Sequence, residues 1–291
     1  MKLWPTIILL IYCGVAWWRL DLLPGNWFGD ISNVHEYADQ IRLGQWPWYF
    51  IQSSGPFYHY FIVPLTWIFG QNYWGYKSIS AVVGGMGLVA IYLMSEQIAG
   101  KRVAIFTSLI TAVSFWYVVW ARVGNTHIVI PLQAAIIIYS IFRYKKSQKM
   151  RWLIPAVLSA GSGLLTYPQT FFLPLLAIGW LAALKRGKAV VVLVCLMIPM
   201  VVVWGRMIAK QRDIFAPGGF VGNKIPQVKD LQKVETYQTT FRYLVKTTLM
   251  LHFKGDEIFR TNVPYSPQLD NISGVVFLPE LFIGGEKIKN I

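Results

Sequence analysis

Long apolar segments follow one another through most of this 291-residue chain and constrain its fold more than any other feature. A transmembrane helix needs about 20 mostly apolar residues. The segments that approach this length cover residues 3–18, 78–95, 103–121, 123–142, 152–166, 168–184 and 189–204. The uncharged stretch 152–184 is too long for one span, and Tyr167-Pro168 marks its break because proline interrupts a helix. The sequence therefore predicts an all-α polytopic membrane protein.

The composition agrees with a membrane protein and argues against a nucleic-acid-binding protein. Charged residues make up 14% of the chain, where soluble proteins carry about 25%. The net charge is +14, but the basic residues bracket the apolar segments, as they do in cytoplasmic loops. Cys13 and Cys195 both lie inside apolar segments, so neither a disulfide nor a cysteine metal site is indicated.

The basic loops also predict an orientation. Residues 3–18 are expected to be a retained signal anchor with a cytoplasmic N-terminus. Residues 57–69 are shorter than a span and contain His59 and Pro64, so we expect an interfacial or re-entrant helix. The short basic loops at 101–102, 143–151 and 185–188 then all fall inside, as the positive-inside rule requires.

Three regions follow from this pattern. Residues 1–204 are expected to form a transmembrane bundle whose first outer loop, 21–56, carries interfacial helices. Residues 205–273 form a second outer loop, in which 227–251 has the pattern of an amphipathic helix. Residues 274–291 look like the start of a further, truncated span.

Asp30 stands at the head of a helical pattern directly after the first span. Val34, Tyr37, Ala38 and Ile41 recur at the spacing of one helix face. Asp30 is then either a helix cap or a general base that accepts a proton from a hydroxyl group. The pattern alone leaves both roles open, although carboxylates are sparse here, with thirteen Asp and Glu in the chain.

Other polar groups fall on the same predicted outer face. Arg122 ends an apolar helix, where it serves either as an interfacial anchor or as a clamp on phosphate oxygens. Tyr167 lies in the turn between two short spans. Arg260 and Asn262 form another donor pair, for which a solvated loop is the alternative.

Four residues raise the question of a metal ion. His35, Glu36, His59 and His127 could supply ligands, but no H-x-x-x-H or H-E-x-x-H spacing is present. We therefore assign no metal site and no cofactor, and leave a divalent cation open. The sequence also contains no P-loop and no nucleophile-elbow motif, so ATP-driven transport and serine hydrolysis have no support.

Several short motifs follow one another in a set order along nearly the whole chain. They are Gly29-Asp30, Ala38-x-x-Ile41-x-x-Gly44, Gly55-Pro56, Ala121-Arg122-Val123-Gly124, Gly163–Tyr167, Phe253–Asp256 and Arg260–Pro264. Each motif is weak alone, but their order resembles a known family, the dolichyl-phosphate-mannose–protein mannosyltransferases in their broad prokaryotic sense, which includes aminoarabinose lipid A transferases. These are GT-C glycosyltransferases.

The resemblance implies a GT-C helical bundle and a site at its outer face. Asp30 matches the catalytic base of the first outer loop, and Ile31 follows it where relatives often carry Glu. Arg122 matches an arginine near the donor phosphate. Arg260 and Asn262 are expected to contact the same phosphate and to order the outer loop. His35, Glu36, His59, His127 and Tyr167 are expected to line the substrate cavity.

The implied reaction is inverting transfer of a sugar from a polyprenyl phosphate to a hydroxyl group. The acceptor is a glycan, a lipid or a protein on the outer side of the cytoplasmic (inner) membrane, where the enzyme is a multi-pass protein. Relatives usually continue through further spans, so this chain looks truncated. The alternatives are a flippase for lipid-linked saccharides and a catalytically inactive fragment.

Overall fold

A computed structural model describes residues 3–23, 29–216, 219 and 233–253, and every regular element in these ranges is a helix. The predicted all-α class is therefore confirmed. The elements are α1 (Leu3–Trp17), α2 (Gly29–Arg42), α3 (Pro56–Phe69), α4 (Tyr73–Ala99), α5 (Lys101–Val113), α6 (Phe115–Arg122), η1 (Thr126–Ile128), α7 (Val129–Ser147), η2 (Met150–Trp152), α8 (Leu153–Leu164), η3 (Pro168–Phe171), α9 (Phe172–Ala183), α10 (Gly187–Lys210), α11 (Arg212–Phe215) and α12 (Val234–His252).

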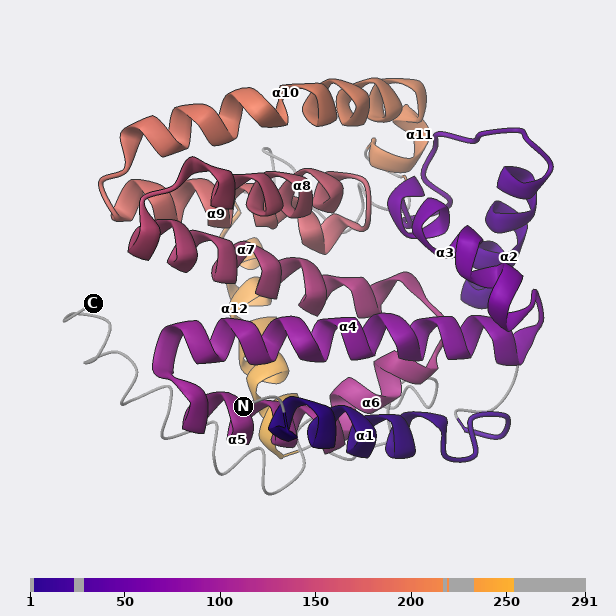
Figure 1. Ribbon diagram of the computed structural model, residues 1–291. Coiled ribbons are helices and arrows are strands. Elements are labelled where there is room, and N and C mark those ends of the chain that lie inside the picture. The colour runs from indigo at the N-terminus through magenta and orange to yellow at the C-terminus, as the bar shows by residue number, and fades with distance from the viewer. Residues whose placement is uncertain (1–2, 24–28, 217–218, 220–232, 254–291) are drawn as a thin grey trace.

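The long helices lie side by side as a bundle (Figure 1). Among the described residues, α4, η1–α7 and α10 are each long and apolar enough to cross a membrane, and α5–α6 qualifies as a bent pair. The helix α1 and the η3–α9 segment are apolar but shorter. The segment predicted at 152–166 falls on η2 and α8, and each of the other predicted spans falls on one or two of the helices just named. The chain is thus a multi-pass membrane protein.

One predicted span is broken at a position that no sequence pattern indicates. The segment 103–121 was expected to be a single helix, but α5 and α6 meet at Ser114 with a bend of 58°. Ser114 has an extended backbone (ψ 134°), and its hydroxyl accepts a hydrogen bond from the Tyr117 amide at 3.4 Å. A serine that caps a new helix in this way stops the preceding one.

The break predicted at Tyr167-Pro168 is present. The helix α8 ends at Leu164, Tyr167 is extended (φ −156°, ψ 154°), and η3 begins at Pro168. The Thr170 hydroxyl accepts a hydrogen bond from the Tyr167 amide at 3.1 Å, which closes the turn. This turn brings Tyr167 to the end of the bundle where the first loop lies.

The helix α4 packs against α1, α3, α5, α6 and α7 and forms the centre of the bundle. Glycines on α4 allow this close packing. A Cβ atom on Gly84 would lie 2.2 Å from the Tyr12 hydroxyl of α1, and the Tyr117 hydroxyl of α6 donates to the Gly84 carbonyl at 2.6 Å. Small residues let membrane helices approach closely, and hydroxyl-to-backbone bonds then join them.

The two ends of the bundle differ in character. The helices α2, α3 and α11 lie at the right-hand end in Figure 1, whereas the α4–α5, α7–α8 and α9–α10 turns lie at the left-hand end. Those three turns contain the short basic loops at 101–102, 143–151 and 185–188. The helix α3 sits beside α2 at the opposite end (Figure 1), and whether it is interfacial or re-entrant stays a prediction.

The second predicted outer loop is described only in part. Within 227–251, where an amphipathic helix was expected, α12 begins at Val234 and exposes Tyr237, Phe241 and Leu244 on one face. Arg260, Asn262 and the expected further span at 274–291 lie outside the described residues.

Candidate active site

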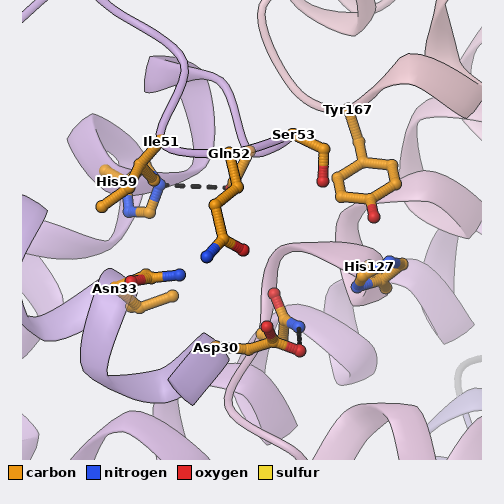
Figure 2. Close-up of a pocket in the computed structure, with 11 residues that line it drawn as sticks. Asp30, Asn33, Ile51, Gln52, Ser53, His59, His127 and Tyr167 are labelled. Carbon is orange, nitrogen blue, oxygen red and sulfur yellow. Dashed lines mark hydrogen bonds between the residues drawn. The ribbon is translucent and has the colours of Figure 1, made fainter. Parts of the chain in front are cut away.

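A polar cavity of about 170 Å³ lies at the α2–α3 end of the bundle (Figure 2). It is formed by the first turn of α2, the loop before α3, the α6–η1 connection and the turn at Tyr167. The lining residues are Asp30, Asn33, Val34, Ile51, Gln52, Ser53, Ser54, His59, Asn125, His127 and Tyr167. Four of the residues predicted for the site, Asp30, His59, His127 and Tyr167, are therefore brought together.

Asp30 lies in the first turn of α2, where the positive end of the helix dipole favours a carboxylate. Its Oδ2 accepts a hydrogen bond from Asn125 Nδ2 at 3.3 Å. Asn125 is itself held in place, because its Oδ1 accepts a hydrogen bond from the Thr126 amide at 2.5 Å. Among the described residues Asp30 Oδ1 has no hydrogen-bond partner, so one carboxylate oxygen stays available to a substrate in the cavity.

His59 is fully buried beneath the cavity and is neutral. Its ring stacks on Tyr37 with the ring centres 4.2 Å apart, and its Nε2 lies 3.3 Å from the Ser54 hydroxyl. That hydroxyl is in turn 2.6 Å from the Thr126 hydroxyl. Burial lowers the pKa of His59 to about 3, because desolvation disfavours the charged imidazolium. His59 therefore adds no positive charge to the cavity at neutral pH.

His127 and Tyr167 form the opposite wall. The His127 ring lies between Trp120 and Tyr167, with ring centres 4.6 and 4.4 Å away. Figure 2 shows the two side chains facing Asp30 across the cavity. The residues come from different helices, so this wall depends on the packing of α6, η1 and the α8–η3 turn.

Arg122 does not line the cavity. Its guanidinium group donates hydrogen bonds to the main-chain oxygens of Val15 at 3.4 Å and Trp18 at 2.5 Å. These carbonyls belong to the C-terminal end of α1, where the helix dipole favours a cation. Arg122 thus joins α6 to the end of α1, and a role toward a donor phosphate stays a prediction.

Lys77 of α4 binds main-chain oxygens just after the end of α1. It is fully buried, and its ammonium group donates to the Leu20 carbonyl, to the Leu23 carbonyl at 3.0 Å and to the Tyr73 hydroxyl at 3.3 Å. Two cations therefore hold the end of α1, from which the chain continues toward Asp30.

His35 and Glu36 lie away from the cavity. His35 Nδ1 is 3.0 Å from the Tyr76 hydroxyl, and its Nε2 is 3.4 Å from Asp39 Oδ2. Glu36 is exposed on α2. Within the described residues no group of three or more His, Cys, Asp or Glu side chains could hold a metal ion. The role of these residues in a substrate site stays a prediction.

The cavity also contains residues that sequence reasoning missed. They are the neutral polar residues Asn33, Gln52, Ser53, Ser54 and Asn125. Asn33 follows Asp30 by three positions in a helix, which places both on one face, so the pattern could have indicated it. The other four lie in connections whose course no periodicity predicts.

A second, apolar cavity of about 590 Å³ lies next to the first. It is bordered by α3, α4, α7, α8 and α10, and its lining includes Phe57, Phe61, Leu132 and Leu165. Two backbone hydrogen bonds lie between the cavities, from the Gly55 amide to the Thr166 carbonyl at 2.7 Å and from the Phe57 amide to the Leu165 carbonyl at 3.0 Å. We call this pair of bonds the clasp. Ser54 and Tyr167 on one side of the clasp line the polar cavity, and Phe57 and Leu165 line the apolar one.

A comparison with known protein families identifies the chain. The model of the dolichyl-phosphate-mannose-protein mannosyltransferase family matches residues 53–205, which is more than half of the chain. The chain belongs to this family. It is therefore a membrane glycosyltransferase of the GT-C type. No protein of curated function and no solved structure gives a significant match.

The family match covers one side of the cavity. Ser54, His59, Asn125, His127 and Tyr167 all lie within residues 53–205. Asp30, Asn33 and Gln52 precede that range, and the structure places them against the matched part. Asp30, the candidate base, is thus linked to the matched region by its hydrogen bond with Asn125.

Proposed function

We propose that this chain transfers a sugar from a polyprenyl-phosphate donor to an acceptor hydroxyl group, with Asp30 as the general base. The observation that carries the proposal is the position of the Asp30 carboxylate. It lies in a polar cavity with one oxygen available, beside an apolar cavity of about 590 Å³ in the bundle. A donor with a polar sugar and a long hydrocarbon chain needs two such compartments side by side.

The chemistry assigned to Asp30 is proton transfer. The acceptor O–H bond breaks as its proton passes to Asp30 Oδ1, and the acceptor oxygen forms a bond to the anomeric carbon of the donor sugar. The bond from that carbon to the phosphate oxygen breaks, and the electron pair leaves with the polyprenyl phosphate. Attack opposite the leaving group inverts the anomeric centre. No nucleotide takes part, because the lipid phosphate is the leaving group.

Asn125 prepares Asp30 for this step. Its amide group holds Oδ2 and is itself fixed by the Thr126 backbone, so the carboxylate cannot turn freely. A base that is already oriented loses less entropy when the acceptor arrives. Asn125 acts through Asp30 and is a positioning residue.

The donor phosphate needs positive charge, which the described cavity lining does not supply. Arg122 remains our proposed source, together with Arg260 and Asn262 from outside the described residues. Arg122 lies three residues before Asn125, and its buried Nε has no partner among the described residues. Arginine offsets phosphate charge both in the bound donor and as charge develops during transfer.

We place the site on the outer side of the cytoplasmic membrane. The basic turns gather at the end of the bundle opposite to α2 and α3, and basic loops favour the cytoplasm. The acceptor, whether glycan, lipid or protein, then approaches the cavity from outside. A divalent cation is not needed for the proton transfer that we describe.

The donor class is tested by transfer assays with the full chain in liposomes. Labelled sugar is offered either on a polyprenyl phosphate or on a nucleoside diphosphate, with a mixture of cell-envelope glycans, lipids and proteins as acceptors. We expect transfer from the polyprenyl phosphate only. Transfer from the nucleotide sugar, or equal transfer from both donors, would contradict the proposal.

A further inference from the structure

We propose that Gln211, which directly follows α10, is a positioning residue for the transfer reaction. It holds the loop that precedes α3 and forms one wall of the polar cavity. The inference rests on the proposed function and deepens it, because it adds a residue beyond the family match that shapes the same site. Gln211 does not line the cavity itself, and it follows the matched range, which ends at residue 205.

The side chain of Gln211 forms two hydrogen bonds with the main chain of Phe50. The Phe50 amide donates to Gln211 Oε1 at 2.6 Å, and Gln211 Nε2 donates to the Phe50 carbonyl at 2.9 Å. A carboxamide carries an acceptor and a donor on one planar group, so it can pair with a residue as a neighbouring β-strand would. Phe50 lies in a loop without regular secondary structure, and Gln211 takes the place of its backbone partner.

The ring of Phe50 is anchored at the same end of α10. It is buried, with its centre 5.3 Å from the Phe215 ring of α11 and 6.2 Å from the Phe171 ring of η3. Both contacts are edge-to-face, an arrangement that aromatic pairs favour. Trp204 of α10 packs on Phe171 in the same way at 5.4 Å. The start of the loop is therefore fixed to the α10–α11 junction by both its backbone and its side chain.

The loop held in this way leads to the candidate base. The amides of Ile51 and Ser54 each donate to the other's carbonyl at 2.9 Å, which closes a turn. The Ser54 hydroxyl lies 2.6 Å from the Thr126 hydroxyl. Next to Thr126, the side chain of Asn125 donates to Asp30 Oδ2 at 3.3 Å. A continuous set of contacts thus runs from the loop to the carboxylate.

The turn is strained and needs to be held from outside. Gln52, at its centre, has a φ of +53°, in the left-handed region that residues other than Gly, Asn and Asp rarely adopt. Such backbone conformations persist where the surrounding structure enforces them. Gln211 holds the turn on one flank, and the clasp at Gly55 holds it on the other. Loss of the Gln211 bonds should therefore relax the turn and displace Ser54.

The first measurement needs no turnover. Hydrogen–deuterium exchange of the purified full chain in detergent compares the wild type with Gln211→Met and Gln211→Glu. Methionine has a similar length but cannot form either bond, and glutamate keeps the size but sets a negative oxygen against the Phe50 carbonyl. In both variants we expect the amides of residues 50–55 to exchange about tenfold faster, because the lost hydrogen bonds raise the population of the open loop. The amides of α4 should keep their protection.

The second measurement is sugar transfer from a polyprenyl phosphate in liposomes. Both variants should lower kcat about tenfold, because displaced groups around the reacting atoms slow the reaction. The affinity for sugar-free polyprenyl phosphate should stay at the wild-type value, since residues 51–54 line the polar cavity and not the apolar one.

Gln97→Met is the matched control. Gln97 is also a half-buried glutamine whose side chain forms a hydrogen bond, with Arg143 at 3.5 Å, but it lies near the C-terminal end of α4 at the opposite end of the bundle. This variant should keep the wild-type exchange of residues 50–55 and the wild-type kcat.

A double-variant cycle with Ser54→Ala distinguishes positioning from a general loss of stability. If Gln211 acts through the contact between Ser54 and Thr126, the variant with both Gln211→Met and Ser54→Ala should be no slower than the slower single variant. Two independent effects would multiply, and the double variant would then be slower than either single variant by the full factor of the other.

The outcomes separate this inference from the function on which it rests. If residues 50–55 exchange at the wild-type rate in both Gln211 variants, if both keep wild-type kcat, or if the effects in the cycle multiply, the inference is wrong and the function stands. Lost protection of α4 in both variants would show a role in folding and would also overturn the inference. If the wild type transfers no sugar from a polyprenyl phosphate, the proposed function is wrong, and the role of Gln211 in transfer falls with it.

Discussion

At the scale of single residues, burial decides which polar groups carry charge. His59 lies against Tyr37 with no exposed surface, so the neutral imidazole is the stable form in the folded protein. Asp30 is only half-buried and lies in the first turn of α2, where the helix dipole favours negative charge. The two residues therefore line one cavity from different surroundings, one without solvent and one partly exposed.

The low pKa of His59 predicts an acid sensitivity. The unfolded state binds a proton near pH 6.5, whereas the folded state does so only near pH 3. Between these values the unfolded state binds more protons, so folding stability should fall as the pH falls from about 6.5 toward 3. In detergent, the melting temperature of His59→Phe should fall less steeply with acid than that of the wild type.

His35→Phe serves as the control, since His35 is partly exposed and pairs with Asp39. If His59→Phe and the wild type lost melting temperature in parallel over this range, His59 would not be the group responsible.

At the scale of elements, the clasp joins the loop before α3 to the α8–η3 turn and separates the two cavities. It requires glycine at position 55, because a Cβ atom there would lie 2.3 Å from the Leu165 carbonyl oxygen and 2.8 Å from the Phe50 ring. The two backbone hydrogen bonds and this close approach form one unit. The clasp therefore couples the sugar end and the lipid end of the proposed donor site.

Gly55→Ala should open the clasp. We expect the overpacked methyl group to cost about 1–3 kcal/mol of stability and to weaken donor binding. Gly179→Ala in α9 is the control, because a Cβ atom at Gly179 meets nothing within 4 Å. Thermal unfolding and donor binding in detergent measure the two effects. If Gly55→Ala and Gly179→Ala had the same melting temperature and the same donor affinity, the clasp would not shape the site.

The sequence predicts elements better than it predicts contacts. The lengths of the apolar segments located the bundle helices, and Tyr167-Pro168 located the break between α8 and η3. Both predictions succeeded because they depend on local chemistry. The bend at Ser114 was missed because a lone serine within an apolar run carries no periodic signal. Arg122 was placed at the correct helix end, but its partners on α1 are about a hundred residues away in sequence and could not be inferred from spacing.

At the scale of the whole molecule, function depends on bringing distant segments to one end of a bundle. The polar cavity combines residues from before and within the family match, and the apolar cavity beside it is built from five helices. The same arrangement explains why the sequence analysis did not identify Asn125 and Gln52 as cavity residues. Both lie in connecting loops, and these loops meet only because α4, α7 and α8 pack together.

The central claim is that Asp30 is the base of a glycosyl transfer. Its most direct test is transfer of labelled sugar from a polyprenyl phosphate by Asp30→Asn, with Asp39→Asn as control, since Asp39 lies on the same helix and pairs with Arg42 outside the cavity. We predict that Asp30→Asn lowers kcat by about 10²–10⁴-fold and leaves donor binding nearly intact, because a base acts only as the hydroxyl attacks. Asp39→Asn should keep wild-type turnover. Wild-type turnover in Asp30→Asn would contradict the account.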